Sequence, residues 1–288
     1  MSGFTDLWYR SSDGLRLYAR DYAGPDVDAP VALCMHGLTR NSADFAGLAP
    51  HLTQRYRVLV VDQRGRGRSA CDPEPARYQP LTYVQDMFRL LDEQDVQQAV
   101  LVGTSMGGLM AMMMAAMQPA RVSAIVLNDI GPEVDPAGLA RIKAYVGKAE
   151  PVADWAAAVA QTRAINGDAF PTFSAEDWLR FARALYRPQA QGDGLELAYD
   201  PAIATPLAAA EDAAVPPDLW PLFDAIATLP ILVLRGAHSD ILSSAGLRAM
   251  QQRKPDLSVA VVSDRGHAPT LDELDARAAI DAFLKLSA

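Results

Sequence analysis

The sequence predicts an α/β protein built on a mostly parallel sheet, with helices on both faces and a helical insertion. Short, continuous runs of Val, Ile and Leu are typical of strands that are covered on both faces. These runs alternate with longer helical patterns, which implies right-handed crossovers between parallel strands. The alternation stops after Asp129 and resumes at Pro230, and the segment between them contains no convincing strand.

The predicted elements follow one another in a regular order. Residues 7–22 hold two alternating segments around the turn "SDG", and this pattern predicts an opening antiparallel hairpin. Strands are predicted at 31–35, 57–62, 99–103, 124–129, 230–236 and 257–262. Helices are predicted at about 42–54, 80–95, 106–117, 243–253 and 271–286. The strands and helices therefore belong to one sheet that is covered on both faces.

The interruption of this pattern predicts a cap. The segment between the two halves of the sheet pattern consists of Ala-rich amphipathic stretches separated by turn-forming residues. An independent helical bundle is the alternative, but the short length and the lack of linkers at both ends count against it. Open α/β sheets bind ligands at the carboxyl ends of their strands, and an insertion at that edge covers the binding site. We expect a core of 1–132 and 226–288 covered by a cap of 133–225.

Composition narrows the classes of function. The formal charge of −9 disfavours binding to nucleic acid. Two cysteines are too few for a disulfide scaffold, and no Cys, His and carboxylate cluster has metal-ligand spacing, so no metal or other cofactor is expected. No signal peptide is recognisable, and no stretch reaches the ~18 apolar residues of a membrane span. We expect a soluble cytoplasmic protein with no membrane partner; no pattern sets an oligomeric state.

The segment "VGTSMGG" has the form G-x-S-x-G around Ser105. A buried strand precedes it and a helical run follows it, as a sharp strand-to-helix turn requires. Gly103 and Gly107 stand two places on either side of the serine, where a Cβ would clash in so tight a turn. The alternative is a small residue at an ordinary strand–helix junction. The combined setting favours a nucleophilic serine at the N-terminus of a helix, where backbone N–H groups favour negative charge.

A serine hydroxyl needs a base, and the chain has four histidines. His267 follows the last predicted strand and is the expected base. His36 directly follows a strand and fits the loop that stabilises an oxyanion. His51 lies in a helical pattern, and His238 precedes a better candidate for the acid.

Three aspartates compete to orient the imidazole and stabilise its charged form. Asp240 follows the next-to-last strand and gives the chain order Ser, Asp, His, so we expect it to be the acid. Asp129, after the strand that follows the nucleophile, is the substitute. Asp264 lies three residues before His267 and is interpreted as a loop charge.

The remaining candidate residues surround these three. Two backbone N–H groups are needed for a developing oxyanion, and we expect them from Met106, directly after the nucleophile, and from Leu38 in "HGLTRN". His36 and Arg40 are candidate substrate-binding residues. Arg40 is a candidate for binding a substrate carboxylate bidentately, with a surface ion pair or a helix-entry role as the alternative.

These segments resemble the α/β-hydrolase superfamily over essentially the whole chain. The resemblance is carried by "HG" after the third strand, "DQRGRGRS" after the fourth, the G-x-S-x-G turn, and the later "SD" and "GH". "HGLTRN", "LNDIGPEV" and "LRGAHSDIL" further resemble a set of predicted hydrolases. The resemblance implies a mostly parallel eight-stranded sheet, a catalytic triad and a helical cap.

A serine in the turn distinguishes among the reactions of this superfamily. Haloalkane dehalogenases and epoxide hydrolases use an aspartate there, so carboxylic ester or lactone hydrolysis through an acyl-enzyme on Ser105 is expected, as in carboxylesterases. One alternative is carbon–carbon bond hydrolysis of ring-cleavage products. The segment "GTSMGG" favours this reaction, whereas the lack of a glycine-rich oxyanion loop counts against it. The other alternative is cofactor-free peracid formation. A non-enzymatic binding module is disfavoured by the complete triad. The aromatic residues of the cap predict an apolar or aromatic small-molecule substrate.

Overall fold

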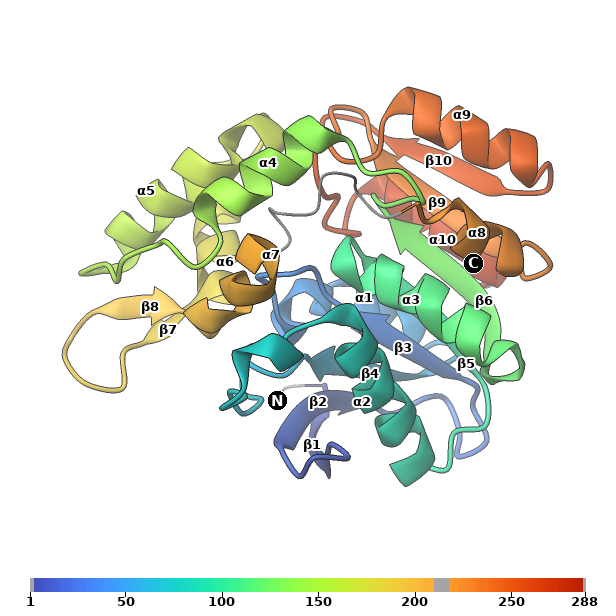
Figure 1. Cartoon of the computed structure of the whole chain (residues 1–288), viewed down its shortest axis with the longest axis horizontal. Helices are drawn as coiled ribbons and strands as arrows, with labels where there is room; N and C mark the ends of the chain where they lie inside the picture. Colours follow the sequence, from blue (N-terminus) through green and yellow to red (C-terminus); the bar gives the residue numbers. More distant parts are fainter. Residues whose placement is uncertain (1–2, 210–217, 287–288) are drawn as a thin grey trace.

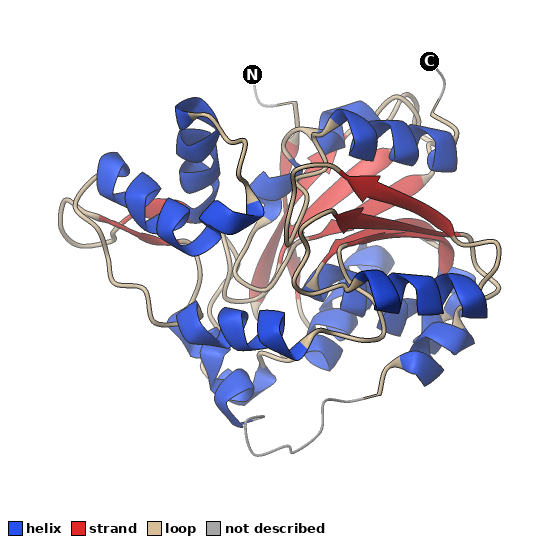
Figure 2. Cartoon of the chain, turned by 90° about the horizontal axis from the view of Figure 1, so that it is seen from above, coloured by secondary structure: helices blue, strands red, loops and turns tan. Residues whose placement is uncertain are grey.

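The computed structural model describes residues 3–209 and 218–286. An eight-stranded sheet runs through the middle of the molecule, with helices on both faces (Figures 1 and 2). In spatial order its strands are β1 (Thr5–Arg10), β2 (Arg16–Tyr22), β4 (Arg57–Asp62), β3 (Val31–Met35), β5 (Ala99–Thr104), β6 (Val122–Asn128), β9 (Ile231–Gly236) and β10 (Ser258–Val262). β2 pairs antiparallel with both of its neighbours, and every pairing from β4 to β10 is parallel. The predicted fold class is confirmed.

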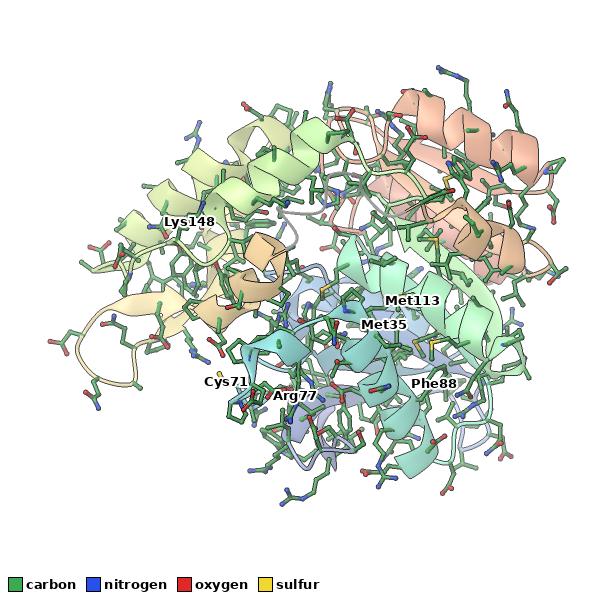
Figure 3. The ribbon with its side chains drawn as sticks, viewed as in Figure 1. Met35, Cys71, Arg77, Phe88, Met113 and Lys148 are labelled. Carbon is green, nitrogen blue, oxygen red and sulfur yellow. The ribbon has the colours of Figure 1, made fainter. Side chains whose placement is uncertain are left out.

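The central strands bury side chains on both faces. Within β3, Leu33 belongs to one core cluster, whereas Ala32 and Cys34 belong to the other, and all three are fully buried. This explains why the strand is a continuous apolar run rather than an alternating one. The first cluster includes Met35 and Phe88, which are labelled in Figure 3.

Each face of the sheet has its own helices. The cluster on the first face includes side chains of α2 (Pro80–Glu93), α3 (Met106–Met117), α8 (Trp220–Ala225) and α9 (Ser244–Arg253). The cluster on the second includes those of α1 (Leu48–Leu52) and α10 (Leu274–Leu284). The predicted helix at 42–54 is divided, since Ser42–Phe45 forms a 3₁₀ turn before α1 begins.

The elements between β6 and α8 gather beside the sheet, at the left of Figure 1. They are α4 (Pro136–Tyr145), α5 (Trp155–Asn166), α6 (Ala175–Leu185), β7 (Tyr186–Pro188), β8 (Leu195–Leu197) and α7 (Thr205–Ala209). The hairpin β7–β8 corrects the expectation that this segment contains no strand. Its strands are too short to form an apolar run, so the pattern did not reveal them.

The range predicted for the cap, 133–225, extends beyond these elements. Residues 210–217 lie outside the described part of the chain. α8 falls within the predicted range but packs against α3, and its Phe223 is fully buried in the first core cluster. Among the described helices, none is long and apolar enough to cross a bilayer.

Candidate active site

Ser105 lies at the sharp turn between β5 and α3. Its φ of +53° and ψ of −115° are a strained backbone conformation for a residue with a Cβ. A Cβ on Gly103 would lie 2.3 Å from the carbonyl carbon of Gly107, and one on Gly107 would lie 2.0 Å from the carbonyl oxygen of Met35. Both positions therefore require glycine, and the strained turn lifts the serine out of the end of the strand.

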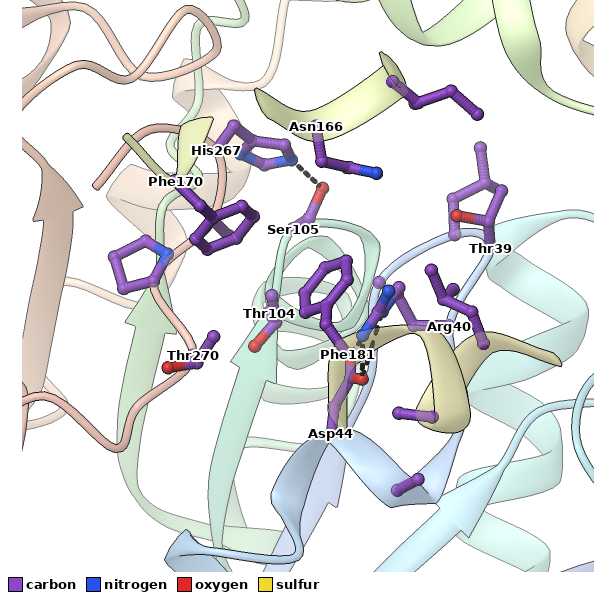
Figure 4. Close-up of a pocket in the computed structure, with 18 of the residues that line it drawn as sticks. Thr39, Arg40, Asp44, Thr104, Ser105, Asn166, Phe170, Phe181, His267 and Thr270 are labelled. Atoms are coloured by element: carbon purple, nitrogen blue, oxygen red, sulfur yellow. Dashed lines mark hydrogen bonds and ion pairs between the residues drawn. The ribbon is translucent and has the colours of Figure 1, made fainter. Parts of the chain in front are cut away.

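Ser105, His267 and Asp129 form a continuous hydrogen-bonded chain. His267 Nε2 lies 2.8 Å from Ser105 Oγ, and His267 Nδ1 lies 2.8 Å from Asp129 Oδ2 (Figure 4 draws the first of these bonds). Because a carboxylate only accepts hydrogen bonds, Nδ1 carries the proton and Nε2 is free to accept the serine proton. The three residues come from the ends of β5, β6 and β10, which meet at the same edge of the sheet.

Asp129 is held by other groups besides the histidine. Its Oδ1 accepts a hydrogen bond from the Gly236 N–H at 2.8 Å, and its Oδ2 accepts one from Ser239 Oγ at 2.6 Å. The side chain is fully buried. A buried carboxylate with this many donors is held in a single orientation, as the partner of an imidazole requires.

The prediction that Asp240 orients His267 is wrong, and the substitute, Asp129, occupies that place. Asp240 instead forms a bidentate ion pair with Arg141 of α4, at 2.5 and 3.0 Å. Burial acts to raise the pKa of Asp240, but the hydrogen bond and charge of Arg141 outweigh it and the net shift is downward. The physical reason is local: Ser239 fills the space beside Asp129, and α4 packs so closely on this loop that a Cβ on Gly138 would lie 2.0 Å from the Asp240 carbonyl oxygen.

His36 does not face the cavity, so its predicted contact with substrate is wrong. The side chain is fully buried, with Nδ1 2.7 Å from the Gly37 carbonyl oxygen and Nε2 accepting the Gln63 N–H at 3.0 Å. Burial lowers the pKa of His36 to about 3, which keeps the ring neutral. The bond from Gln63 joins the loop after β3 to the loop after β4, in keeping with a role in supporting the oxyanion loop.

Arg66 belongs to the segment "DQRGRGRS", and its sequence pattern indicated no role for it. Its Nε donates to the Leu38 carbonyl oxygen at 2.9 Å, and its Nη1 donates to Tyr83 Oη at 2.8 Å. The guanidinium is almost completely buried and fixes the peptide that carries the predicted oxyanion donor. In the described residues, neither the Leu38 N–H nor the Met106 N–H makes a hydrogen bond to the rest of the chain.

A cavity of about 430 Å³ opens over Ser105 and His267. Core residues in the ranges 37–47, 104–105 and 267–272 line it together with residues of the inserted elements. The inserted residues that line it include Ile142, Tyr145, Asn166, Phe170, Phe173, Phe181 and Tyr199. The five aromatic residues among them all lie within the range predicted for the cap. Figure 4 shows Phe170, Phe181 and Asn166 around the serine.

Arg40 lines the same cavity and forms an ion pair with Asp44, as the alternative interpretation expected; its binding of a substrate carboxylate stays a prediction. Its Nε donates to Asp44 at 2.8 and 3.0 Å, and its Nη2 does so at 2.5 Å. The guanidinium carbon stands 4.0 Å from the centroid of the Phe181 ring. The side chain is 15% exposed.

The fold and this hydrogen-bonded chain together define the α/β-hydrolase class. A model of the alpha/beta hydrolase fold family matches residues 30–274, and the chain belongs to this family. A crystal structure of an α/β hydrolase from Novosphingobium aromaticivorans superimposes with a TM-score of 0.93 and 43% identity, over 100% of both chains.

Two curated relatives have named reactions. A 3-hydroxybutyrate-oligomer hydrolase of Cupriavidus necator is 36% identical over 265 residues, which are 90% of this chain and 90% of that protein. A 2-(acetamidomethylene)succinate hydrolase of Mesorhizobium japonicum is 30% identical over 238 residues, 83% of this chain and 81% of that protein. The protein is thus a member of a hydrolase family whose relatives include an ester hydrolase.

Proposed function

We propose that the protein is a serine hydrolase of carboxylic esters and that its substrates are short oligomers of a hydroxy acid. The single observation that carries the proposal is the continuous hydrogen-bonded chain from Ser105 through His267 to Asp129 at the floor of the cavity. A serine in this arrangement is activated by the adjacent base and attacks an acyl carbon.

The reaction proceeds in two steps. Ser105 Oγ attacks the ester carbonyl carbon while His267 Nε2 takes the serine proton, and the ester C–O bond then breaks as the leaving alkoxide receives that proton. Water next adds to the acyl-enzyme, again losing a proton to His267, and the acid is released with restoration of the serine. Asp129 orients the imidazole and stabilises the imidazolium in both steps.

The negative charge that develops on the carbonyl oxygen needs preorganised donors. We assign these to the N–H groups of Leu38 and Met106. Both are without a hydrogen bond in the described chain, and Arg66 holds the Leu38 peptide in place. Loss of one such donor typically costs about 10²–10³ in kcat.

The substrate class rests on similarity and on the cavity. The Cupriavidus relative, similar over 90% of both chains, is named as a hydrolase of 3-hydroxybutyrate oligomers, whose units are joined by ester bonds. A cavity of about 430 Å³ with three phenylalanines in its wall suits a short chain with apolar branches. A lactone is the cyclic form of the same bond and belongs to the same proposal. We further propose that residues 133–209 act as the cap over this site and that the protein works in the cytoplasm.

The similarity to the Mesorhizobium relative supports a second candidate, the hydrolysis of 2-(acetamidomethylene)succinate or a close analogue. The two candidates are separated by substrate. Purified protein is assayed with 3-hydroxybutyrate dimer and trimer, with 2-(acetamidomethylene)succinate and with p-nitrophenyl esters from acetate to decanoate, each with wild type and Ser105→Ala.

The proposal expects release of 3-hydroxybutyrate from the oligomers, hydrolysis of a p-nitrophenyl ester with an optimum at one chain length, and loss of both activities in Ser105→Ala. A fluorophosphonate probe should label wild type stoichiometrically and leave Ser105→Ala unlabelled. Absence of labelling, or oligomer hydrolysis that survives Ser105→Ala, would contradict it. Ring-cleavage products, and hydrogen peroxide with a carboxylic acid, test the carbon–carbon and peracid alternatives with the same two proteins.

A further inference from the structure

We propose that Arg40 binds the free carboxylate at the end of the oligomer, so that the enzyme cleaves the last ester bond and releases one hydroxy acid at a time from the carboxyl end. This inference rests on the proposed function and specifies which bond of the substrate reaches Ser105. It is carried by the position of Arg40 beside the nucleophile and by the edge of its guanidinium that remains open.

Arg40 and Ser105 both lie close to Gly37. A Cβ built on Gly37 would lie 3.5 Å from Arg40 Cγ and 3.7 Å from Ser105 Cβ. Because glycine has no side chain, the space between the arginine and the nucleophile stays open to the cavity that both residues line. In the view of Figure 4, the Arg40 side chain lies between Ser105 and Asp44.

Asp44 occupies only one edge of the guanidinium. Arginine has five N–H bonds in a planar fork, and Asp44 accepts from the edge made by Nε and Nη2. Nη1 makes no hydrogen bond with the described residues, and it is not one of the side-chain nitrogens that are shut off from solvent without a partner. The edge made by Nη1 and Nη2 is therefore available for a second, bidentate carboxylate.

The arginine is held rigidly in this orientation. Phe181 of α6 lies against one face of the guanidinium at 4.0 Å, and Asp44 fixes its edge, so that the plane is set before any ligand binds. With 15% of the side chain exposed, a charge on a bound ligand is screened less than at the surface. A preorganised donor pair in a partly dry site favours recognition of a carboxylate.

Another arginine of the cavity, Arg180, does not have these properties. It donates to Asp177 at 2.8 Å, and 69% of its side chain is exposed at the rim. A solvated arginine at the rim contributes little to binding. It serves as the matched control.

The chemistry of the substrate determines which ester bond lies at Ser105 when Arg40 binds the terminal carboxylate. A linear oligomer of a 3-hydroxy acid has one free carboxylate, and this group is four bonds from the carbonyl carbon of the last ester, about 5 Å in an extended chain. An arginine next to the nucleophile therefore selects the last ester bond. The leaving alcohol is the terminal hydroxy acid, and the shortened oligomer is released from Ser105 by water with a new carboxylate at its end.

The test uses the linear 3-hydroxybutyrate dimer and its N-methylamide, in which a neutral amide replaces the charged terminal carboxylate. For wild type we expect kcat/KM for the acid to exceed that for the amide by about tenfold or more. In Arg40→Gln this ratio should fall to about one, mainly through KM, while Arg180→Gln should keep the wild-type ratio. Equal rates on acid and amide in wild type, or an unchanged ratio in Arg40→Gln, would overturn the proposal.

The direction of cleavage is read with an O-acetylated trimer and mass spectrometry of the first products. Cleavage from the carboxyl end gives free 3-hydroxybutyrate and acetylated dimer; acetylated monomer as the first product overturns the proposal. Fluorophosphonate labelling of Arg40→Gln reports that the fold and Ser105 are intact. A wild type that is labelled and hydrolyses p-nitrophenyl butyrate but ignores the terminal charge refutes only this inference, whereas an unlabelled wild type refutes the proposed function.

Discussion

Asp129 Oδ2 lies 2.8 Å from His267 Nδ1, while Asp240, four residues after the end of β9, is bound by Arg141 of α4. The carboxylate that meets the imidazole thus follows β6. The carboxylate after β9 ties the inserted helix to the core. Two acids at neighbouring strand ends have separate tasks, and each can be tested on its own.

Asp129→Asn and Asp240→Asn should differ by orders of magnitude in activity. Replacing the acid of a Ser–His–Asp arrangement by its amide typically lowers kcat by about 10⁴, because the histidine is left in the wrong tautomer. We therefore expect a loss of this order in Asp129→Asn and a change of less than about tenfold in Asp240→Asn. Hydrolysis of p-nitrophenyl butyrate by both variants measures this. The reverse ranking would show that Asp240 is the acid in solution.

Arg66→Met should lower kcat more than it changes KM. The substitution removes the bond from Nε to the Leu38 carbonyl oxygen and frees the peptide whose N–H we assign to the oxyanion. A loss of about 10–10² in kcat is expected, somewhat less than for outright removal of a donor. Tyr83→Phe removes a different bond of the same guanidinium and is the control, with less than about fivefold expected. Equal effects of the two variants would indicate general loss of packing.

Gly107→Ala should destabilise the protein, because its Cβ would lie 2.0 Å from the Met35 carbonyl oxygen and the backbone would have to move. We expect the free energy of unfolding to fall by about 2–4 kcal/mol. Gly167→Ala, where the added Cβ meets no atom within 4 Å, should change it by less than about 0.5 kcal/mol. Urea unfolding of both variants gives the comparison, and a stable Gly107→Ala would contradict the tight turn.

His36 should contribute to loss of stability in acid. Burial lowers its pKa in the fold to about 3, whereas the unfolded chain has the ordinary value near 6.5. Between these values the unfolded state binds more protons, so the stabilisation is complete above about pH 6.5 and is lost by about 1.4 kcal/mol per unit as the pH falls through that window. Urea unfolding at several pH values should give a shallower dependence for His36→Gln than for wild type. Identical dependence would mean that the His36 ring has access to water.

Local sequence determines the elements that depend on neighbours in the chain. The buried strands are continuous Val, Ile and Leu runs because both faces of the sheet are covered, and this makes the fold predictable from the sequence. The turn at Ser105 was equally predictable, since a Cβ on Gly103 or Gly107 would clash where the start of α3 packs against the ends of β5 and β3. The strands β7 and β8, each held by pairing with the other, have no such run and were missed.

Contacts between neighbouring strand ends decided which carboxylate orients His267, a choice that the sequence pattern left open. Asp129 and Asp240 both follow parallel strands that end at one edge, and both lie between Ser105 and His267 in the chain. The order Ser, Asp, His, on which Asp240 was preferred, therefore does not separate them. The choice depends on Ser239 and the Gly236 N–H, which hold one carboxylate toward His267, and on Arg141, which draws the other away. Arg66 likewise acquires its role only when β4 brings its loop against that of β3. The sequence by itself determined the fold, the serine and the histidine, because each leaves a local pattern. The acid was decided by side chains distant in sequence that meet only in the tertiary structure, and the orientation of Arg40 depends both on its near neighbour Asp44 and on the distant Phe181.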